Sequence, residues 1–526
     1  MKFIFAVLLL VSSISVHGEQ LQPRKPFILG YPSLHSIPQG DSVQLHISSS
    51  SNEFSLIIHR IAAKREKVFE KQSVPCSQQS IPDRASSDGC NWPATFELKI
   101  NKAWKSGYYE ATLSTPEGAK GKLFFVVRNA RPAENSGILI QLAFNTYNAY
   151  TNWGGHSLYS YHDRDGLQGH SVSFDRPLRS DFDKWEKPFV SWAESNGYTL
   201  DYAINNDLEF HPEILKNYKL VLSLGHDEYW STPMRDNLEK FIAEGGNVAF
   251  LSGNTCCWQI RNENNGRKQT CWKQWYNLDP HYRTTDHRKL STLWSHHLIG
   301  RPENELTGVG FLWGGYHKSH GQFMDGSASF EVHRPKHWIF EGTKLKTGDH
   351  FGGKDTIVGY ECDGCEMVWR DGLPYPTHND GTPKNFTILA TCPARWHPGD
   401  SYWYERFPKD RTGAAVLGTY SNNGTVVTVG TTDWAHGLRG KDPTVVQITH
   451  NILTKLSGKD KQASLHGPLD PRRSLASIQL NDPGLEVQLV ASEPLVVDPV
   501  AFDWDKEGRL WAVSYTHLTL PTNREV

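Results

Sequence analysis

The chain has 526 residues, a formal net charge of −2 and an isoelectric point near 6.9. A chain of this length can form two or three domains, each with its own hydrophobic core. The sequence contains no basic stripe, which argues against a nucleic-acid-binding protein. Aromatic residues are frequent, with 18 Trp, 20 Tyr and 23 Phe. Such residues fill cores or line ligand-binding surfaces, including surfaces that bind sugars.

The N-terminus has the pattern of a signal peptide. Lys2 supplies the positive start, residues 3–11 form an apolar run, and a cleavage site of small residues ends at Gly18. The apolar run is too short to cross a bilayer, and no later segment is long and apolar enough. We therefore predict a signal peptide at residues 1–18, no membrane span, and a secreted or periplasmic protein.

The eight cysteines could form disulfides in an exported protein. Cys76 and Cys90 flank a polar loop and form one predicted pair. Cys362 and Cys365 form a C-x-x-C motif without a second motif at zinc-finger spacing, which favours a local disulfide over a zinc site.

Residues 20–130 have the pattern of a β-sandwich. Short alternating runs at 42–47 and 53–61 are interrupted by Gly, Pro and Ser, and residues 108–114 and 122–127 resemble closing strands. The expected structure is an immunoglobulin-like sandwich.

Residues 135–456 change to an α/β pattern. Residues 137–144 are continuously apolar, as in a strand that is buried on both faces. Further strands are expected at 199–203, 219–224, 247–251 and 425–429, and helices at 181–195, at 233–243 with Thr232 as N-cap and Pro233 at the first helical position, and at 443–456. This alternation predicts a doubly wound, mostly parallel sheet of the flavodoxin or glutamine-amidotransferase type. Residues 258–422 are irregular, and we predict large insertions with some β structure there.

The C-terminal part has three segments. Residues 457–475 form a charged linker that contains proline, and residues 476–513 resemble the start of the β-propeller in secreted bacterial dehydrogenase-like proteins. Residues 514–526 resemble a translated sequencing adapter, so we expect a non-native tail and a longer natural chain. One propeller hairpin cannot bury its own apolar face, and we expect it to be poorly ordered alone.

Three polar and aromatic motifs follow three of the predicted strands. They are N-T-Y-N-A-Y-T-N-W-G-G-H-S-L-Y at 145–159, G-H-D-E-Y-W at 225–230 and S-G-N-T at 252–255. In an open α/β sheet, ligands bind outside the carboxyl ends of the strands. If the strands are parallel, the three motifs meet at one edge and form a functional site.

The second and third motifs contain residues that suit catalysis. His226, Asp227 and Glu228 combine an imidazole with carboxylates, which suits metal binding or acid–base catalysis. The alternative role is a charge at a helix start, which is weakened because Thr232 already occupies the cap. One of the two acids could still serve only as such a charge, Asp227 more readily than Glu228. Asn254 could donate to a developing oxyanion or simply form a turn.

The same motifs argue against two classes of enzyme. The sequence G-H-D-E-Y has Asp where a nucleophile elbow needs Ser or Cys. No P-loop or G-x-G-x-x-G motif follows a strand. A serine or cysteine hydrolase and a nucleotide-binding enzyme are therefore disfavoured.

Together with G-G-N-V-A-F-L-S-G-N-T-C-C-W at 245–258 and G-T-T-D-W-A-H-G-L at 430–438, these motifs resemble the C-terminal region of the large (beta) subunit of the iron-dependent N,N-dimethylformamidases. The resemblance spans about residues 26–456 and includes S-G-Y-Y-E-A-T-L at 106–113 in the sandwich. The family's large subunit has additional N-terminal sequence and a small partner subunit, neither of which this chain represents. The identity of the substrate is therefore not transferred.

The resemblance implies a mononuclear Fe(III) centre with two tyrosinates and one glutamate. By motif, the implied residues are the metal ligands Tyr109, Tyr150 and Glu228, with Tyr108 and Tyr147 as competing phenols, and the catalytic groups His226 and Asn254. Phenolate and carboxylate oxygens are hard ligands that favour trivalent iron over zinc.

Two functions remain open from the sequence. The first is a secreted iron-dependent hydrolase that cleaves a carbon–nitrogen amide bond. The second is a non-catalytic or carbohydrate-directed module of a secreted sugar-processing protein, which the sandwich, the Trp content and the propeller-like segment also suit. The expected partner is a small amide or a carbohydrate, and the sequence is compatible with a homo-oligomer.

Overall fold

The computed structural model describes residues 25–162, 166–317, 328–396, 398–407, 411–458, 488–489 and 499–514. The predicted signal peptide, the linker from residue 459 onward and the tail beyond Ser514 lie outside the described residues. The chain divides into two units, residues 1–458 and 459–526. In the second unit, β26 (Pro499–Trp504) and β27 (Leu510–Ser514) form an antiparallel hairpin. Among the described helices, none has the length and apolar character needed to span a membrane.

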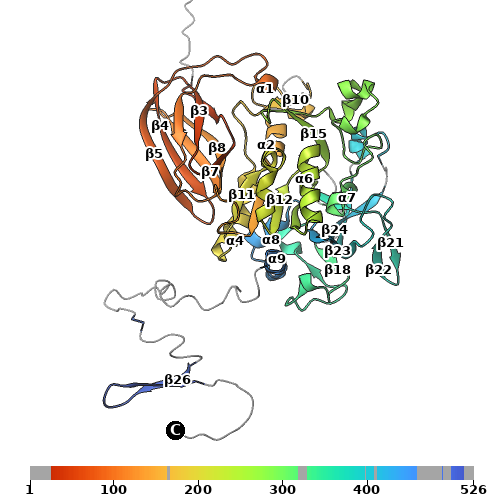
Figure 1. Cartoon of the computed structure of the whole chain (residues 1–526). Helices are drawn as coiled ribbons and strands as arrows, with labels where there is room; N and C mark the ends of the chain where they lie inside the picture. The colour runs from red at the N-terminus through yellow and green to blue at the C-terminus, as the bar shows by residue number, and fades with distance from the viewer. Residues whose placement is uncertain are drawn as a thin grey trace, which may run out of the picture. The chain divides into compact units, whose positions relative to one another are not determined.

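The N-terminal part of the first unit consists of two β-sheets (Figure 1). One sheet has the order β1 (Ile28–Pro32), β3 (Ser42–Ser49), β6 (Phe96–Lys99), and the other the order β2 (Ser36–Pro38), β8 (Lys120–Arg128), β7 (Gly107–Ser114), β4 (Glu53–Ile61), β5 (Arg65–Pro75). Alternate residues such as Leu45, Ile58 and Phe125 point into the core between the sheets. The opposite face of the larger sheet contributes Tyr108 and Phe124 to the core of the adjoining α/β part.

The α/β part is built on one large mixed sheet. Its main strands have the order β11 (Asp201–Ile204), β9 (Ile138–Leu142), β12 (Leu220–His226), β14 (Asn247–Gly253), β25 (Gly424–Thr428), β24 (Thr412–Asn422), β23 (Thr387–Arg395), β17 (Gly310–Tyr316), β20 (Glu361–Gly364), and β18 (Phe330–Val332) and β19 (His350–Phe351) lie beside β23. The first five of these strands are parallel. From β24 onward every pairing is antiparallel.

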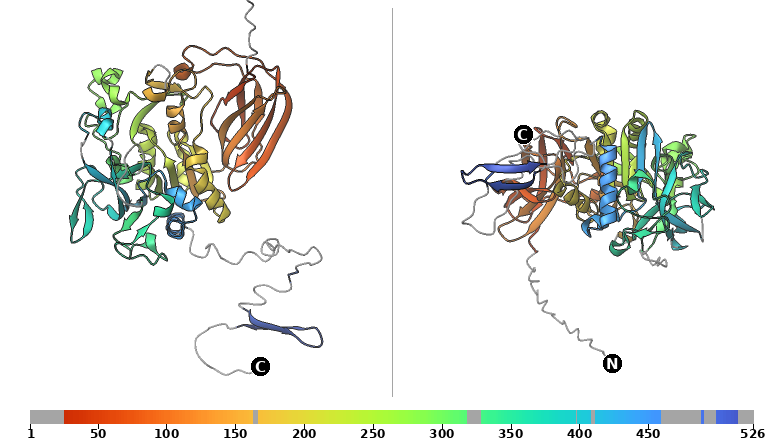
Figure 2. Two further views of the ribbon diagram at one scale, coloured as in Figure 1. Left: turned by 180° about the vertical axis from the view of Figure 1, so that it is seen from behind. Right: turned by 90° about the horizontal axis from the view of Figure 1, so that it is seen from below.

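Helices cover both faces of this sheet (Figure 2). On one face lie α3 (Phe182–Trp185), α4 (Lys187–Ser195), α8 (Trp434–Arg439) and α9 (Pro443–Leu456), and on the other α5 (Asn205–Phe210) and α6 (Thr232–Ala243). Side chains alternate along each strand, so Leu222 of β12 packs in the first core and Val221 in the second. The first core also includes Tyr108 of the sandwich, which ties the two parts together.

The prediction of a doubly wound, mostly parallel sheet is wrong. Strands account for 35% and helices for 23%, and the sheets are mixed or antiparallel. The error arises from residues 258–422, which were expected to be insertions. They supply β17, β20, β23 and β24, and these strands extend the sheet itself. Antiparallel neighbours need no crossover helix, so this half of the sheet lacks the strand–helix alternation of a doubly wound fold.

Of three local predictions about helices, one is confirmed and two are wrong in detail. The helix at 443–456 is confirmed, because Asp442 caps the backbone N–H groups of Thr444 and Val445. The helix expected at 181–195 is broken at Glu186 into α3 and α4. The predicted cap of α6 is wrong by one residue, since the Ser231 hydroxyl accepts from the Met234 N–H at 3.3 Å.

None of the eight cysteines, all of them in the described part of the chain, is disulfide-bonded. The predicted Cys362–Cys365 bridge is wrong, because the two side chains pack in cores on opposite faces of the sheet. The predicted Cys76–Cys90 pair is wrong as well: Cys76 packs against the sandwich core, and Cys90 lies in a separate small cluster with Tyr31 and Trp92.

The remaining strands and α-helices are short. They are α1 (Ala85–Asp88), α2 (Phe144–Tyr150), α7 (Asn304–Thr307), the sheet β10 (Ser171–Ser173), β16 (Lys268–Thr270), β15 (Trp258–Glu263), β13 (Tyr229–Ser231), and the hairpin β21 (Met367–Arg370), β22 (Leu373–Pro376). Of these, α2 and the four-stranded sheet continue directly from the carboxyl ends of β9, β12 and β14.

Candidate functional site

The carboxyl ends of three parallel strands bring the three sequence motifs together. The register pairs Leu222 of β12 with Ile140 of β9, and Leu224 of β12 with Leu251 of β14. Helix α2 follows β9 and ends at Tyr150, Glu228 comes two residues after β12, and Asn254 follows β14. Tyr150, Glu228 and Asn254 line one cavity of about 290 Å³. The motifs therefore converge as the strand pattern predicted.

The antiparallel half of the sheet closes the other side of this cavity. Tyr316 of β17, Glu361 of β20 and Trp396 after β23 line it, together with Trp403 from the 3-10 helix Pro398–Trp403. Most of the lining is aromatic, and the carboxylates of Glu228 and Glu361 are buried within it. The cavity is therefore small and lined mainly by aromatic rings, and two buried carboxylates contribute to its wall.

Glu228 lies at the centre of a cluster of oxygen atoms. Its Oε1 accepts hydrogen bonds from Trp258 Nε1 at 2.7 Å and from the Tyr159 hydroxyl at 2.9 Å. The Tyr150 hydroxyl oxygen lies 2.8 Å from the Tyr159 hydroxyl oxygen. Two phenols and one carboxylate therefore converge on one point, from a loop, a helix end and a strand end.

His226 joins this cluster to a second carboxylate. Its Nε2 lies 2.6 Å from Glu361 Oε2 and 3.3 Å from Glu228 Oε2. Burial by itself would lower the pKa of His226, but Glu361 and Glu228 outweigh burial and raise this pKa to about 10. Burial opposes ionisation of Glu228, yet His226 lowers the pKa of this carboxyl overall. At neutral pH the arrangement favours an imidazolium between two carboxylates.

Asp227 points away from the cavity and has a structural role. Its carboxylate accepts hydrogen bonds from Gln141 Nε2 at 2.5 Å, Ser223 Oγ at 2.8 Å and Asn205 Nδ2 at 2.9 Å. These bonds tie the end of β12 to β9 and α5. The expectation that Asp227 is a helix-capping charge is wrong, because Ser231 caps α6.

Asn254 sits in a strained turn that a third buried carboxylate holds. Its φ is +50°, in the left-handed region. The backbone N–H groups of Asn254 and Thr255 donate to the Asp363 carboxylate at 3.0 and 3.1 Å. The Asn254 Oδ1 atom is buried and has no hydrogen-bond partner in the described part of the chain. The turn thus presents an unsatisfied amide to the cavity.

Tyr109 does not lie near this cluster. It is fully buried in the sandwich core, where its hydroxyl donates to the Lys105 carbonyl at 2.6 Å and its ring stacks on Trp104 and Phe125. Successive residues of a strand point to opposite faces, so Tyr109 of β7 faces the sandwich interior. The expected convergence of Tyr109 with Tyr150 and Glu228 is therefore wrong.

The two competing phenols have other partners too. Tyr108 donates to Ser180 Oγ at 2.8 Å, and Tyr147 donates to Glu186 Oε1 at 2.5 Å. Of the four phenols considered from the sequence, only Tyr150 lines the cavity.

Sequence reasoning missed Tyr159 and Glu361. Tyr159 is the last residue of the first motif, so the signal was present but gave no reason to prefer it over other tyrosines. Glu361 belongs to the segment that was expected to be an insertion, and no local pattern marks it. Only the pairing of β20 with β17 places Glu361 at the site.

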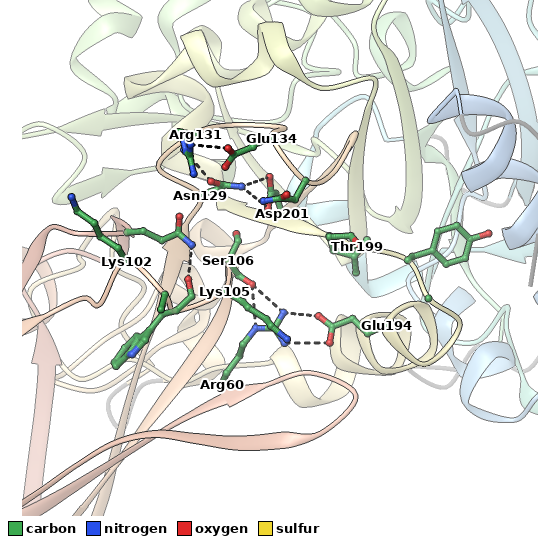
Figure 3. A pocket seen from close by; sticks show the side chains of 17 residues that line it. Arg60, Lys102, Lys105, Ser106, Asn129, Arg131, Glu134, Glu194, Thr199 and Asp201 are labelled. Atoms are coloured by element: carbon green, nitrogen blue, oxygen red, sulfur yellow. Dashed lines mark hydrogen bonds and ion pairs between the residues drawn. The ribbon is translucent and has the colours of Figure 1, made fainter. Parts of the chain in front are cut away.

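A larger cavity, about 560 Å³, lies elsewhere, at the junction of the sandwich and the α/β part (Figure 3). Most of its charged groups are paired with one another. Arg60 contacts Glu194 at 2.6 Å, and Arg131 contacts Glu134 at 2.8 Å. These pairs indicate a junction between two parts of the fold rather than a reactive site.

A second histidine cluster does not have the features of a metal site. The side chains of His296, His297 and Glu405 come within ligand-like distances of one another. However, His296 Nδ1 accepts from the Leu298 N–H at 3.2 Å, which leaves the proton of the neutral ring on Nε2. That Nε2 faces Glu405 at 3.6 Å as a donor, so it has no lone pair for a cation.

Comparisons with known proteins agree with the motifs. Residues 59–447 match the family model described as N,N-dimethylformamidase beta subunit-like, C-terminal, and residues 470–521 match a domain of unknown function (DUF7133). The N,N-dimethylformamidase beta subunit of an Alcaligenes species is 26% identical over 370 residues, which cover 58% of this chain and 44% of the relative. The subunit of the same name from Paracoccus aminophilus is 24% identical over 464 residues, covering 72% and 56%. The chain thus spans about half the length of these relatives.

Among solved structures, a superoxide reductase (neelaredoxin) from Ignicoccus hospitalis matches with a TM-score of 0.12 and 9% identity, covering 19% of this chain and 82% of its own. The first immunoglobulin domain of mouse SynCAM 2 matches with a TM-score of 0.12 and 14% identity, covering 20% and 98%. These scores are too low to indicate a shared fold. Because the family match at 59–447 covers most of the chain, the protein belongs to the N,N-dimethylformamidase beta subunit-like family.

Proposed function

We propose that this protein is an iron-dependent hydrolase that cleaves the carbon–nitrogen bond of a small amide. The observation that carries the proposal is the convergence of the Tyr150, Tyr159 and Glu228 oxygens at the base of an aromatic cavity. Relatives named N,N-dimethylformamidase beta subunit support amide hydrolysis as the reaction class. In this proposal Tyr159 takes the place first expected for Tyr109.

The residues fit a hard trivalent cation. Phenolate and carboxylate oxygens are the donors that Fe(III) prefers. Asn254 Oδ1 is buried and lacks a hydrogen-bond partner in the part of the chain that the structure describes. Buried polar atoms are rarely left unsatisfied, so this orphaned oxygen at the edge of the cavity supports a bound polar group.

When bound there, Fe(III) supplies Lewis acidity that polarises an amide carbonyl and acidifies water. The protein's own groups supply the rest. His226, held between Glu228 and Glu361, carries a proton on Nε2 that can pass to the leaving amine nitrogen. The Asn254 amide can donate a hydrogen bond to the developing oxyanion.

The cavity also limits the substrate. A volume of about 290 Å³ admits a small molecule and excludes a polymer chain. The aromatic lining, which includes Trp258 and Trp403, suits apolar alkyl groups on the amide nitrogen. A carbohydrate-directed module has less support, because the relatives that match most of the chain are named N,N-dimethylformamidase beta subunits. We further propose export to the periplasm or the medium, on the pattern of residues 1–18.

The test compares Tyr150→Phe and Glu228→Gln with Tyr109→Phe in iron-loaded protein. Tyrosinate–iron should give a visible charge-transfer band, and hydrolysis can be followed with a panel of N-alkylated formamides. We expect Tyr150→Phe and Glu228→Gln to lose the band and at least about 100-fold in kcat/KM, as is usual when a metal ligand or its support is removed. Tyr109→Phe should keep both, because its hydroxyl lies in the sandwich core. Folded, iron-free wild-type protein without amidase activity would contradict the proposal.

A further inference from the structure

Lys273 is a buried cation that the proposed reaction does not use. It is 0% exposed and begins the 3-10 helix Lys273–Leu278. Its backbone has a φ of +54°, and its N–H donates to the Ser291 carbonyl at 3.0 Å. Its Nζ atom has no hydrogen-bond partner in the described part of the chain.

Aromatic rings surround this ammonium in place of hydrogen-bond acceptors. The Nζ atom lies 3.2 Å from the ring centroid of Tyr159, 4.6 Å from Trp258, 4.9 Å from Trp403 and 5.2 Å from Tyr229. A cation within about 6 Å of an aromatic face is attracted by the ring quadrupole, most strongly where water is excluded. The four rings come from four separate segments of the chain, and one cation links them.

The cage lies behind the wall of the candidate site. Tyr159, Trp258 and Trp403 line the cavity, whereas Lys273 does not. Tyr159 also donates to Glu228, so the ammonium sits beneath the ring whose hydroxyl meets the central carboxylate. Burial lowers the pKa of Lys273 to about 8, and the nearby Glu228 opposes this decrease.

Stability alone does not account for a lysine at this place. A buried ammonium without hydrogen bonds is costly, and replacing buried charges with apolar groups of similar volume is often neutral or stabilising. A methionine would fill the same space and still contact the rings. The charge itself must therefore contribute something that an apolar side chain cannot.

We propose that Lys273 is a positioning residue that holds Tyr159 and Trp403 in the cavity wall. The rings of Tyr159 and Trp403 are fixed by attraction to the same cation from behind. Lys273 thereby keeps the Tyr159 hydroxyl in contact with Glu228. The positioning part of this inference stands on geometry alone, and its consequence for catalysis rests on the proposed function.

The experiment uses Lys273→Met, which keeps the stem and removes the charge, and Lys273→Arg, which keeps a charge. Lys268→Met is the matched control, because Lys268 lies five residues earlier in an ion pair with Asp88. We expect Lys273→Met to unfold at the same temperature as wild type or higher, but with an altered near-ultraviolet circular dichroism spectrum in metal-free protein. The iron-loaded variant should show a shifted charge-transfer band, because the Tyr159 ring is no longer held in place, and a kcat lower by about 10- to 100-fold with KM little changed. Lys273→Arg should restore part of each effect, and Lys268→Met should match wild type.

Two results would overturn the inference. One is a Lys273→Met spectrum identical to wild type in both the aromatic and the charge-transfer regions. The other is a drop in the unfolding temperature that accounts for the whole loss of activity, which would indicate a purely structural lysine. If wild-type protein binds no iron, the proposed function fails, but the metal-free circular dichroism still decides whether Lys273 positions the wall.

Discussion

Two neighbouring carboxylates at the end of β12 have opposite environments. Asp227 faces the sheet and accepts hydrogen bonds from Gln141, Ser223 and Asn205, whereas Glu228 faces the cavity. Consecutive residues of an extended chain point to opposite sides, so these two adjacent residues supply both an anchor for the sheet and a group of the candidate site.

Asp227→Asn should destabilise the protein without changing the chemistry of the site. In the wild type, both carboxylate oxygens of Asp227 accept hydrogen bonds. The amide side chain of the variant would place an NH₂ group where one of these oxygens was, so at least one buried donor would lose its acceptor. We expect the free energy of unfolding, measured by denaturant titration, to fall by about 2 to 3 kcal/mol. The folded fraction should keep the iron band that Glu228→Gln removes. Equal loss of the band in both variants would show that Asp227 also serves the metal site.

Residue roles could be predicted from the sequence only where they depend on position along one strand. His226 is the last residue of β12, Glu228 comes two residues later and Asn254 directly follows β14, so their meeting requires only that the strands be parallel. The prediction of Tyr109 as a metal ligand was wrong because nothing in the sequence determines which of the two adjacent tyrosines faces which core. No local sequence pattern marks Lys273 as a residue beside the site.

At the scale of elements, the break between α3 and α4 centres on a buried carboxyl. Glu186 occupies the junction and accepts the Tyr147 hydroxyl, and burial raises the pKa of Glu186 to about 8. Pro188, close behind it, cannot donate a backbone hydrogen bond, which favours a new helix start. Such a break is hard to predict because it depends on a tertiary partner.

Glu186 should make stability depend on pH. Its pKa is raised in the folded state, so folded protein keeps a proton that the unfolded chain has already released above its ordinary value of 4.5. Its contribution is full below that value and is lost as pH rises toward about 8. Glu186→Gln should therefore reduce the pH-dependent loss of unfolding free energy between pH 5 and 8 by roughly 1 kcal/mol per pH unit. Parallel slopes in the two proteins would contradict this assignment.

At the scale of the whole molecule, the sandwich is joined to the α/β part by a bidentate ion pair. Arg60 of β4 contacts both Glu194 oxygens, at 2.6 and 3.2 Å, and also donates to the Ser106 carbonyl (Figure 3). Only 9% of the Arg60 side chain and 20% of the Glu194 side chain are exposed. Limited exposure leaves this pair less screened than a surface pair.

A double-mutant cycle with Arg60→Met and Glu194→Gln should give a coupling energy of about 2 kcal/mol in unfolding experiments. The pair Arg131–Glu134 lines the same cavity but is more exposed and serves as the control. Its coupling should be below about 0.5 kcal/mol, as for most surface pairs. Similar values for both pairs would mean that the junction is not held by Arg60.

The overall architecture shows where sequence reasoning stops. The parallel strands were found because continuous apolar runs alternate with helices. The antiparallel half was missed because β17, β20 and β23 are short or flanked by irregular chain, and their order in the sheet departs from their order in the sequence. Pairing between segments more than 100 residues apart, such as β14 with β25, leaves no local pattern.

The division of the large sheet into a parallel and an antiparallel half has an evolutionary consequence. Most groups proposed for bond cleavage, namely Glu228, His226 and Tyr150, lie at or after the ends of parallel strands, and Glu361 is the exception. The aromatic residues that shape the cavity, Tyr316, Trp396 and Trp403, come from the antiparallel half or from loops beside it. Mutations in the second set can reshape the cavity while the reactive set stays in place. Under the proposed function, related chains can therefore diverge in the amides they accept while the residues that follow the parallel strands stay the same.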